Sequence, residues 1–361
     1  MPKVLSHMKR LKAWIRKGVI FAISLIVVIS GCQKITEAPP HQPQTSQEIR
    51  GVWMTHVGNA FYATTGRLDD VFHQLSRLNF NHVYVSVYND GVTYSSKVIY
   101  RNRETNIPIL NPLNNAIHQG KRQGLKVYGW FEYGLMLHDN DPVAKAHPDW
   151  LLNEGQLVDG FVWLNPANPE VEQHFIDLFV EFASLYHKLD GIQLDDHWAV
   201  PSTFGDYAAA LTQLTGKIAT AVKEINPDWI VSLSPNPPDF AYNRYSQDWL
   251  NWVYNGYIDE VIVQIYRSTV QDVETTLAHS GLKEASDYVP VGAGIYAGYR
   301  EEGLAITPLG EVAKQAEFVL NQGYGYSLFT YEYVFSFIRL ARTKTKESFF
   351  ISVNLPAQNH L

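Results

Sequence analysis

Cysteine is nearly absent from this sequence, which has a single one, Cys32, in 361 residues. One thiol cannot form an internal disulfide, and a structural zinc site built from cysteines is excluded for the same reason. The phosphate loop GxxxxGK[ST], the nucleophile elbow GxSxG and the zinc motif HExxH are missing as well. P-loop phosphoryl transfer, elbow-type acyl transfer and HExxH metalloprotease chemistry therefore lack their usual signatures.

Charge is also sparse, because Asp, Glu, Lys and Arg make up only 18% of the residues, with a formal net charge of −7. A basic cluster lies at the extreme N-terminus, formed by Lys3, Lys9, Arg10, Lys12, Arg16 and Lys17. Beyond that cluster no basic stripe is available for nucleic acid or anionic lipid. We therefore expect no nucleic-acid partner.

Long apolar runs are limited to one, from Gly18 to Gly31, which is shorter than the roughly 20 residues that a membrane-spanning helix needs. A basic stretch followed by such a run is typical of a secretory signal, and a permanent membrane helix is the alternative. The run closes with Ile29-Ser30-Gly31-Cys32, which resembles a bacterial lipobox. Cys32 would then be the lipidated residue of an envelope protein facing the periplasm or the exterior, although it could also be an ordinary small apolar residue.

The segment from Ile35 to Gln47 is rich in Pro and Gln and poor in large apolar side chains, so it predicts a tether rather than a folded element. We predict a signal peptide at 1–31, a lipidated N-terminus and linker at 32–47, one folded domain at 48–345 and a C-terminal extension at 346–361. About 300 residues suffice for one large hydrophobic core.

Within this domain, short β-branched or aromatic runs alternate with segments of helical periodicity, as expected of parallel βα units. Eight such runs occur: Gly51–Thr55, His82–Tyr88, Leu125–Glu132, Gly191–Asp195, Ile230–Ser234, Glu260–Tyr266, Pro290–Tyr296 and Tyr324–Tyr331. An open doubly wound sheet usually carries a glycine-rich loop after its first strand, and none follows Trp53. The pattern therefore predicts an α/β fold, a closed (β/α)8 TIM barrel.

Alternate residues of each predicted strand should point into the barrel. The inward sets are Tyr84, Ser86 and Tyr88; Tyr128, Trp130 and Glu132; Gln193 and Asp195; Ser232 and Ser234; Gln264 and Tyr266; and Gly292, Gly294 and Tyr296. Polar and aromatic groups thus gather towards the carboxyl-terminal strand ends, where barrel enzymes carry their active sites.

The fourth run ends in two carboxylates, Asp195 and Asp196, and a buried carboxylate needs a reason because an unpaired buried charge is costly. Asp195 is the first candidate for catalysis because it shares the inward side with Gln193. Asp196 could orient Asp195 or the substrate, and the alternative is that both aspartates cap a helix or pin a loop. A metal site with His197 is disfavoured, because consecutive strand residues point in opposite directions.

Glycoside hydrolysis usually needs a second carboxyl group. Glu332 and Glu132 both lie at predicted carboxyl-terminal strand ends, with a slight preference for Glu332. Aromatic neighbours could raise the pKa of either, as a general acid requires. The alternative is a structural pair with an arginine such as Arg50 or Arg267.

Aromatic residues cluster at the predicted strand ends: Trp53, Tyr88, Trp130, Trp198, Tyr266, Tyr296 and Tyr331. Flat apolar faces with polar tips suit sugar rings, although any single one could simply pack in the core. His56 could join them or be a structural histidine. As a set, they indicate a glycan-binding surface.

The ordered phrases Arg50-Gly51-Val52-Trp53, Gly124 to Trp130, Trp163-Leu164-Asn165-Pro166, Asp190 to Asp196 and Val263 to Arg267 resemble the glycosyl-hydrolase-like family 10 domain, from about Glu48 to Phe335. The resemblance implies a TIM barrel behind a lipoprotein signal. One branch of the family, the DigH-type lipoproteins, cleaves peptidoglycan glycan strands that have been stripped of their peptides. By the same resemblance, Asp195 and Asp196 match the family's carboxylate motif, and Gln264 and Tyr266 match its QxY. His197 and the Phe131-Glu132-Tyr133 phrase depart from the usual pattern.

The sequence thus predicts an endo-acting glycosidase on wall glycan, anchored to a membrane through lipid on Cys32, with no cofactor and no metal. A non-catalytic glycan-binding lipoprotein is one alternative. A hydrolase of another polysaccharide, such as an α-glucan, is the other.

Overall fold

The computed structural model describes residues 48–89, 92–99, 111–298, 306–336, 338 and 342–354. The predicted signal peptide, the lipidation site at Cys32 and the linker lie outside the described residues.

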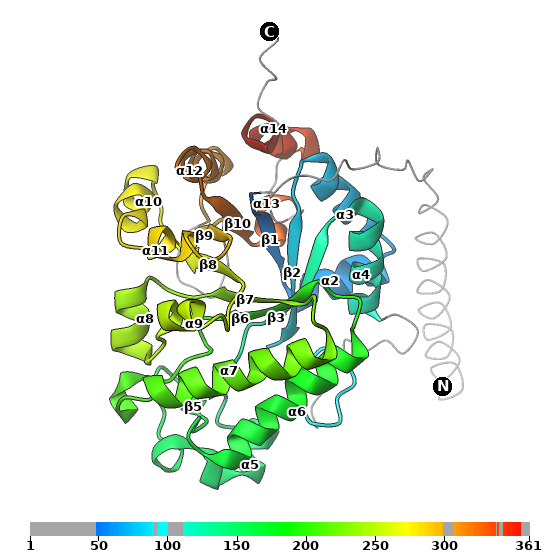
Figure 1. The fold of residues 1–361 in the computed structure, drawn as a ribbon. Coiled ribbons are helices and arrows are strands. Elements are labelled where there is room, and N and C mark those ends of the chain that lie inside the picture. The colour runs from blue at the N-terminus through cyan, green and yellow to red at the C-terminus, as the bar shows by residue number, and fades with distance from the viewer. Residues whose placement is uncertain are drawn as a thin grey trace, which may run out of the picture.

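Eight parallel strands close into a barrel in the order β1-β10-β9-β8-β7-β6-β3-β2, which confirms the predicted (β/α)8 fold (Figure 1). The strands are β1 (Arg50–Met54), β2 (His82–Tyr88), β3 (Lys126–Phe131), β6 (Gly191–Asp195), β7 (Ile230–Ser234), β8 (Glu260–Gln264), β9 (Val291–Tyr296) and β10 (Gly325–Phe329). A separate antiparallel pair, β4 (Met136–Leu137) and β5 (Val162–Trp163), lies in the connection between β3 and β6.

Helices surround the barrel. They are α2 (His56–Thr64), α3 (Leu68–Arg77), α4 (Pro112–Gln123), α5 (Pro142–Ala146), α6 (Pro169–Leu185), α7 (Ala208–Ile225), α8 (Pro238–Tyr245), α9 (Trp249–Tyr254), α10 (Val270–Leu277), α11 (Leu282–Ser286), α12 (Leu309–Asn321), α13 (Tyr331–Val334) and α14 (Thr343–Asn354). Three short 3₁₀ turns are Pro148–Trp150, Leu152–Gly155 and Ser202–Phe204.

Strand β6 shows how the sequence builds the two faces of the barrel wall. Ile192 and Leu194 are fully buried in the layer between the strands and the helices, while Gln193 and Asp195 face the interior. Gly191 is required for close pairing, since a Cβ there would lie 1.9 Å from the carbonyl oxygen of Ile230 on β7. Outside the strand, Asn168 caps α6 by accepting a hydrogen bond from the Glu170 amide, and Pro169 occupies the first turn.

The amino-terminal half of the barrel interior is closed by a buried carboxylate, Glu260 of β8. Its oxygens lie 2.8 Å from the Tyr84 hydroxyl, 3.4 Å from the Tyr128 hydroxyl and 3.2 Å from Nε2 of His82. Burial alone would raise the pKa of Glu260. The charge of His82, together with hydrogen bonds from His82, Ser232 and Tyr84, outweighs burial and lowers this pKa. These side chains fill the amino-terminal half of the barrel interior. A site for chemistry is therefore expected at the carboxyl-terminal end.

Strands β1, β3, β8 and β10 end one or two residues before their predicted ends, whereas β2 ends at Tyr88 as predicted but contains a register shift. The pairing of β2 with β3 shifts between Ser86 and Tyr88, so that Tyr88 pairs with Phe131 and packs with it in the outer core. Strand β10 ends at Phe329, and the chain turns at Thr330 into α13. The register shift in β2 and the early end of β10 each reverse the face on which the following side chain lies.

Helix α14 runs across the predicted division at residue 345. Its Lys346 is buried and donates to the carbonyl oxygens of Phe335 and Ser336, and Asn354 donates to the Leu78 carbonyl. Residues up to 354 therefore belong to the barrel body. In Figure 1, α14 lies at the side of the barrel opposite α5 and β5.

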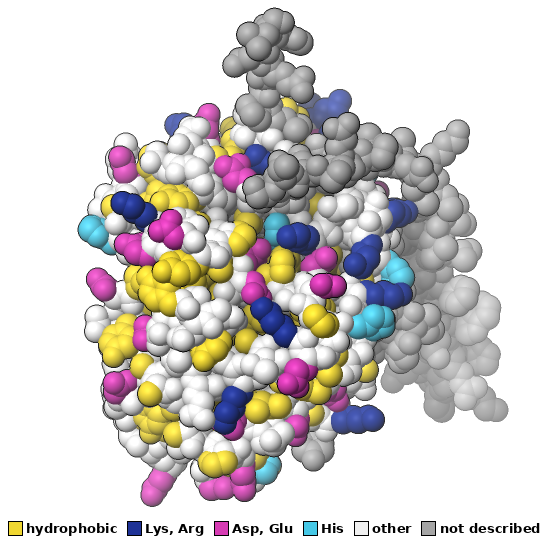
Figure 2. Space-filling model, in the orientation of Figure 1, with side chains coloured by type: hydrophobic (Ala, Val, Ile, Leu, Met, Phe, Trp, Pro, Cys, Tyr) yellow, Lys and Arg dark blue, Asp and Glu magenta, His cyan; other side chains and the backbone are white. Residues whose placement is uncertain are grey.

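On the face shown in Figure 2, acidic and basic side chains are interspersed among apolar ones, without a stripe of one sign. Among the described residues, no helix combines the length and hydropathy that crossing a membrane requires.

Candidate active site

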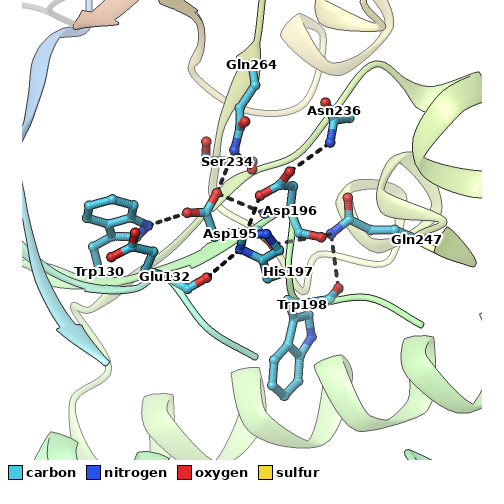
Figure 3. A network of polar contacts seen from close by, with 10 residues as sticks. All are labelled: Trp130, Glu132, Asp195, Asp196, His197, Trp198, Ser234, Asn236, Gln247 and Gln264. Carbon is cyan, nitrogen blue, oxygen red and sulfur yellow. Dashed lines mark hydrogen bonds and ion pairs between the residues drawn. The ribbon is translucent and has the colours of Figure 1, made fainter. Parts of the chain in front are cut away.

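Asp195, the last residue of β6, is held by three donors at the carboxyl-terminal end of the barrel (Figure 3). The Trp130 indole donates to its Oδ2 at 2.6 Å. The Gln264 amide donates to Oδ1 at 2.6 Å, and the backbone amide of Asp196 donates to the same oxygen at 2.9 Å. Because these donors come from β3, β8 and the loop after β6, the carboxyl group has a fixed orientation.

The pKa of Asp195 is raised well above its usual value. Burial is the largest cause, since the side chain is 5% exposed, and the neighbouring charges of Asp196 and Glu132 raise it further. The hydrogen bonds from the Asp196 amide and the Trp130 indole oppose this shift without cancelling it. A carboxyl group of this kind can hold a proton at a pH where exposed carboxylates have lost theirs.

Asp196 begins the loop after β6 and is more exposed than Asp195, with 23% of its side chain accessible. The Asn236 amide donates to its Oδ2 at 2.9 Å, and Nδ1 of His197 lies 3.7 Å from its Oδ1. The Gln247 amide supports the loop by donating to the carbonyl oxygens of Asp195, Asp196 and Trp198. Asp196 is therefore positioned by side chains that follow β7.

Glu132 follows β3 and is the second carboxyl group beside Asp195 (Figure 3). It is half-buried, and the Ser86 hydroxyl donates to its Oε2 at 3.1 Å. Its backbone carbonyl accepts a hydrogen bond from Nδ1 of His197. Gly134 allows these loops to approach, because a Cβ there would lie 2.6 Å from the His197 carbonyl oxygen.

Glu332, the slightly preferred partner from the sequence, occupies a different place. It is the second residue of α13, and its side chain reaches the start of α2, where Oε1 accepts from both the amide and the hydroxyl of Thr55 at 3.1 Å. A Cβ on Gly58 would meet this oxygen at 1.6 Å, so the glutamate is pressed against α2. Burial raises its pKa to about 7. Because the chain turns at Thr330 into α13, the Glu332 side chain points towards α2. The position of Glu132 next to Asp195 therefore favours Glu132 as its partner.

Three predicted substrate-binding residues lie inside the barrel beneath Asp195. The Trp53 indole donates to Oε1 of Gln193 at 2.6 Å, and the Gln193 amide donates to the Ser232 hydroxyl at 3.1 Å. Trp53, Gln193 and Trp130 are at most 1% exposed. They therefore support the site from inside the barrel, and Trp130 acts on Asp195 directly.

Trp198 and Tyr331 do not join the site, which corrects the prediction from strand-end position. The Trp198 indole donates to Thr215 on α7 and packs against Phe175 on α6. The Tyr331 hydroxyl donates to Gln74 on α3. The Trp198 and Tyr331 rings lie against the helices because each strand has already ended. Tyr88 packs in the outer core, and its ring centroid lies 6.5 Å from that of Tyr133. The register shift in β2 turns Tyr88 away from the barrel interior, and its ring packs with Phe131.

Tyr266 and Tyr296 lie together at the carboxyl-terminal end. Their ring centroids are 5.7 Å apart, and Phe329 lies 5.3 Å from Tyr266. Tyr266 is half-buried, whereas Tyr296 is 2% exposed and packs behind it. His56, also half-buried, opens α2 directly after the Thr55 cap.

Sequence reasoning missed Asn236 and Gln247, which hold Asp196 and its loop. Asn236 could have been found, since it follows the fifth predicted strand by two residues in Ser234-Pro235-Asn236. Gln247 lies on the connection between α8 and α9, whose path a strand pattern does not give. Within the described ranges, no group of three His, Cys, Asp or Glu residues is placed to hold a metal ion.

The sequence profile of the glycosyl hydrolase-like 10 family matches residues 48–210 and 207–309. The chain belongs to this family. The chain is also similar to two individual proteins, the glycosyl hydrolase DigH of Escherichia coli strain K12 and the glycosyl hydrolase DigH of Shigella flexneri. Each is 24% identical over 304 residues, covering 64% of this chain and 68% of the relative.

Solved structures similar to this family member share its fold at low sequence identity. An endo-beta-1,4-mannanase from Thermotoga petrophila superposes with a TM-score of 0.54 at 13% identity, covering 79% of this chain and 68% of the mannanase. An alpha-amylase from Lactobacillus plantarum gives 0.51 at 12% identity, covering 86% and 80%. The similarity establishes the barrel architecture.

Proposed function

We propose that this protein is a glycoside hydrolase whose carboxyl pair is Asp195 and Glu132. One observation carries the proposal: Asp195, at the end of β6, and Glu132, directly after β3, lie beside each other at the carboxyl-terminal end of the barrel, and Asp195 has a raised pKa. Membership in the glycosyl hydrolase-like 10 family supports it. Two such carboxyl groups are what glycosidic bond cleavage requires.

In this proposal Asp195 is the proton donor and Glu132 the ionised partner. Leaving-group protonation needs a carboxyl group that keeps its proton, which the burial of Asp195 favours. The partner must reach the substrate or a water molecule, which suits the more exposed Glu132. Asp196, held by Asn236, is placed to accept a hydrogen bond from a sugar hydroxyl.

The proposed substrate is the glycan strand of peptidoglycan. The predicted secretory signal would place the domain outside the cytoplasm, and the sequence resembles the DigH-type branch that acts on stripped glycan strands. The half-buried ring of Tyr133, which directly follows Glu132, and the half-buried ring of Tyr266, which lies two residues after Gln264, suit a sugar polymer.

The direct test is dye release from labelled sacculi pretreated with an amidase. Wild-type protein should release dye, while Asp195→Asn and Glu132→Gln should each lose at least about a hundredfold in rate, the usual contribution of a catalytic acid or base. Asp177→Asn, an exposed change on α6, serves as the control. Retention of labelled glycan without new reducing ends, unchanged in Asp195→Asn, would establish a non-catalytic binder instead. Activity on an α-glucan but not on sacculi would show that the substrate is an α-glucan and not peptidoglycan.

A second assay assigns the two roles. Aryl glycosides with good leaving groups need little proton donation, so Asp195→Asn should keep much more activity on them than on a natural glycan. If Glu132→Gln shows that pattern in place of Asp195→Asn, the roles are reversed.

We also propose that lipid on Cys32 anchors the protein to a membrane in the cell envelope. The lipobox-like Ile29-Ser30-Gly31-Cys32 supports this. Cys32→Ser should move the protein from the membrane to the soluble fraction. Unchanged membrane retention would favour an uncleaved anchor.

A further inference from the structure

The connection between β3 and α6 starts at the candidate site itself, because its first residue is Glu132. It contains the antiparallel pair β4 and β5, in which Met136 pairs with Trp163. Backbone bonds tie it further, with the Leu164 amide donating to the Leu135 carbonyl at 2.8 Å. This connection is therefore an ordered insertion at the carboxyl-terminal end of the barrel.

Three half-buried rings on this insertion continue outward from the carboxyl pair. Tyr133 follows Glu132 directly, and its ring centroid lies 6.1 Å from that of His197. Its hydroxyl is 3.2 Å from Nε2 of His138. Phe161 lies 4.9 Å from the His138 ring and 6.1 Å from the Tyr133 ring. We name Tyr133, His138 and Phe161 the ring platform.

A clamp on α8 fixes the outer edge of the platform. Asp159 and Gly160 form a two-residue turn with φ of 55° and 86°, closed by reciprocal backbone bonds between Val158 and Phe161. The Arg244 guanidinium donates to the Asp159 carboxylate at 3.0 Å, and the Tyr245 hydroxyl donates to it at 3.0 Å. These contacts connect the turn that precedes Phe161 to α8.

Side chains other than the platform rings form the buried core of the insertion. Trp150 and Trp163 are buried, at 7% and 1% exposure, and Leu152 and Leu164 fill the same core. The platform rings keep part of their surface accessible and carry polar tips on Tyr133 and His138. Partly exposed rings with polar edges match the C–H faces and hydroxyls of a sugar ring.

From this arrangement we infer that the ring platform is an additional sugar subsite, which binds a ring of the glycan chain beyond those at the cleaved bond. The inference rests on the proposed function and narrows it, since it makes the substrate an extended polymer. The subsite adds binding energy for longer chains only, so kcat/KM rises with chain length until the platform is filled.

The test compares Phe161→Ala and Phe161→Leu with wild type on glycan oligomers of increasing length. Leucine keeps the apolar contact with His138 but has no ring face. Both variants should lose about three- to tenfold in kcat/KM on the longest chains, the usual value of one aromatic contact, and less than twofold on the shortest substrate. Tyr288→Ala, an exposed ring that precedes β9 at the opposite end of the barrel, should behave as wild type.

Calorimetric titration of the same oligomers into Asp195→Asn, with and without Phe161→Leu, measures binding apart from cleavage. An equal loss on all lengths, or no loss on long chains, overturns the subsite. Length-dependent binding that Phe161→Leu abolishes, in a protein that cleaves no glycan, would retain the subsite and remove the proposed enzyme activity. Wild-type protein that binds no oligomer would overturn the subsite as well.

Discussion

At the residue scale, the chemistry of the candidate site depends on how Asp195 is balanced between burial and hydrogen bonds. Burial and the charges of Asp196 and Glu132 raise its pKa, while donors such as the Trp130 indole hold it back. Removing a single donor should therefore move the titration of Asp195 without removing the carboxyl group.

Trp130→Phe makes this test, because phenylalanine keeps most of the buried ring but loses the N–H that lies 2.6 Å from Oδ2. The lost hydrogen bond favoured the ionised form, so the pKa of Asp195 should rise further. If Asp195 donates the proton, the alkaline limb of the kcat/KM profile should shift to higher pH, with a lower maximum rate. An unshifted alkaline limb would contradict the assignment of the acid.

Glu332 gives a second residue-scale prediction, on stability. Its pKa of about 7 in the folded protein exceeds the unfolded value near 4.5, so the proton it holds stabilises the fold fully below pH 4.5, and this contribution is lost as pH rises through 7. Glu332→Gln cannot ionise and should remove this loss, which is up to about 3 kcal/mol for a shift of this size. Urea unfolding at pH 5 and pH 8 measures it.

Relative to wild type, Glu332→Gln should gain stability at pH 8 compared with pH 5. Its activity on the glycan should stay within about threefold of wild type, because Glu332 contacts Thr55 and lies against α2. A loss of a hundredfold would restore Glu332 to the catalytic pair.

At the scale of elements, the site depends on two loops that pack backbone against backbone. Gly134→Ala would place a Cβ 2.6 Å from the His197 carbonyl oxygen and 2.8 Å from the Trp198 Cα. Neither backbone can move cheaply, so we expect the loops of Glu132 and Asp196 to separate. Activity should fall about tenfold or more, while secondary structure, followed by circular dichroism, stays intact. Wild-type activity in Gly134→Ala would show that the spacing of these loops does not matter.

The same elements show how far sequence reasoning extends. Alternation placed Gln193 and Asp195 on the interior face correctly, since a regular strand has a strict period of two. It failed at Tyr88, where one extra residue in β2 reverses the faces. The choice of aromatic residues by their position at strand ends failed at Tyr331, because β10 has already ended there. A bulge or a strand end depends on pairing with the neighbouring strand, which local composition does not encode.

At the scale of the whole molecule, the barrel separates stability from chemistry along its axis. Glu260, with its lowered pKa, closes the amino-terminal half with His82, Tyr84 and Tyr128. Because its pKa is lowered on folding, its contribution is present above the unfolded value near 4.5 and is lost as pH falls. Asp195 lies on the same interior at the other end.

Glu260→Ala should therefore destabilise the protein by about 3–5 kcal/mol at pH 7, the usual cost of removing one member of a buried polar network, and by less at pH 4. Thermal unfolding at the two pH values measures this. Equal destabilisation at pH 7 and pH 4 would mean that ionisation of Glu260 does not contribute to the stability of the fold.

By itself the sequence determined the barrel, the inward face of β6 and the presence of acidic residues at strand ends, because periodicity and burial are local properties of the chain. Only the tertiary structure decided that Glu132, and not Glu332, lies beside Asp195, and that the turn at Asp159, next to the ring platform, is bound by Arg244 and Tyr245 of α8. Those outcomes depend on where loops from distant parts of the chain meet, and the free energy that fixes each meeting comes from contacts that form only once the barrel has closed.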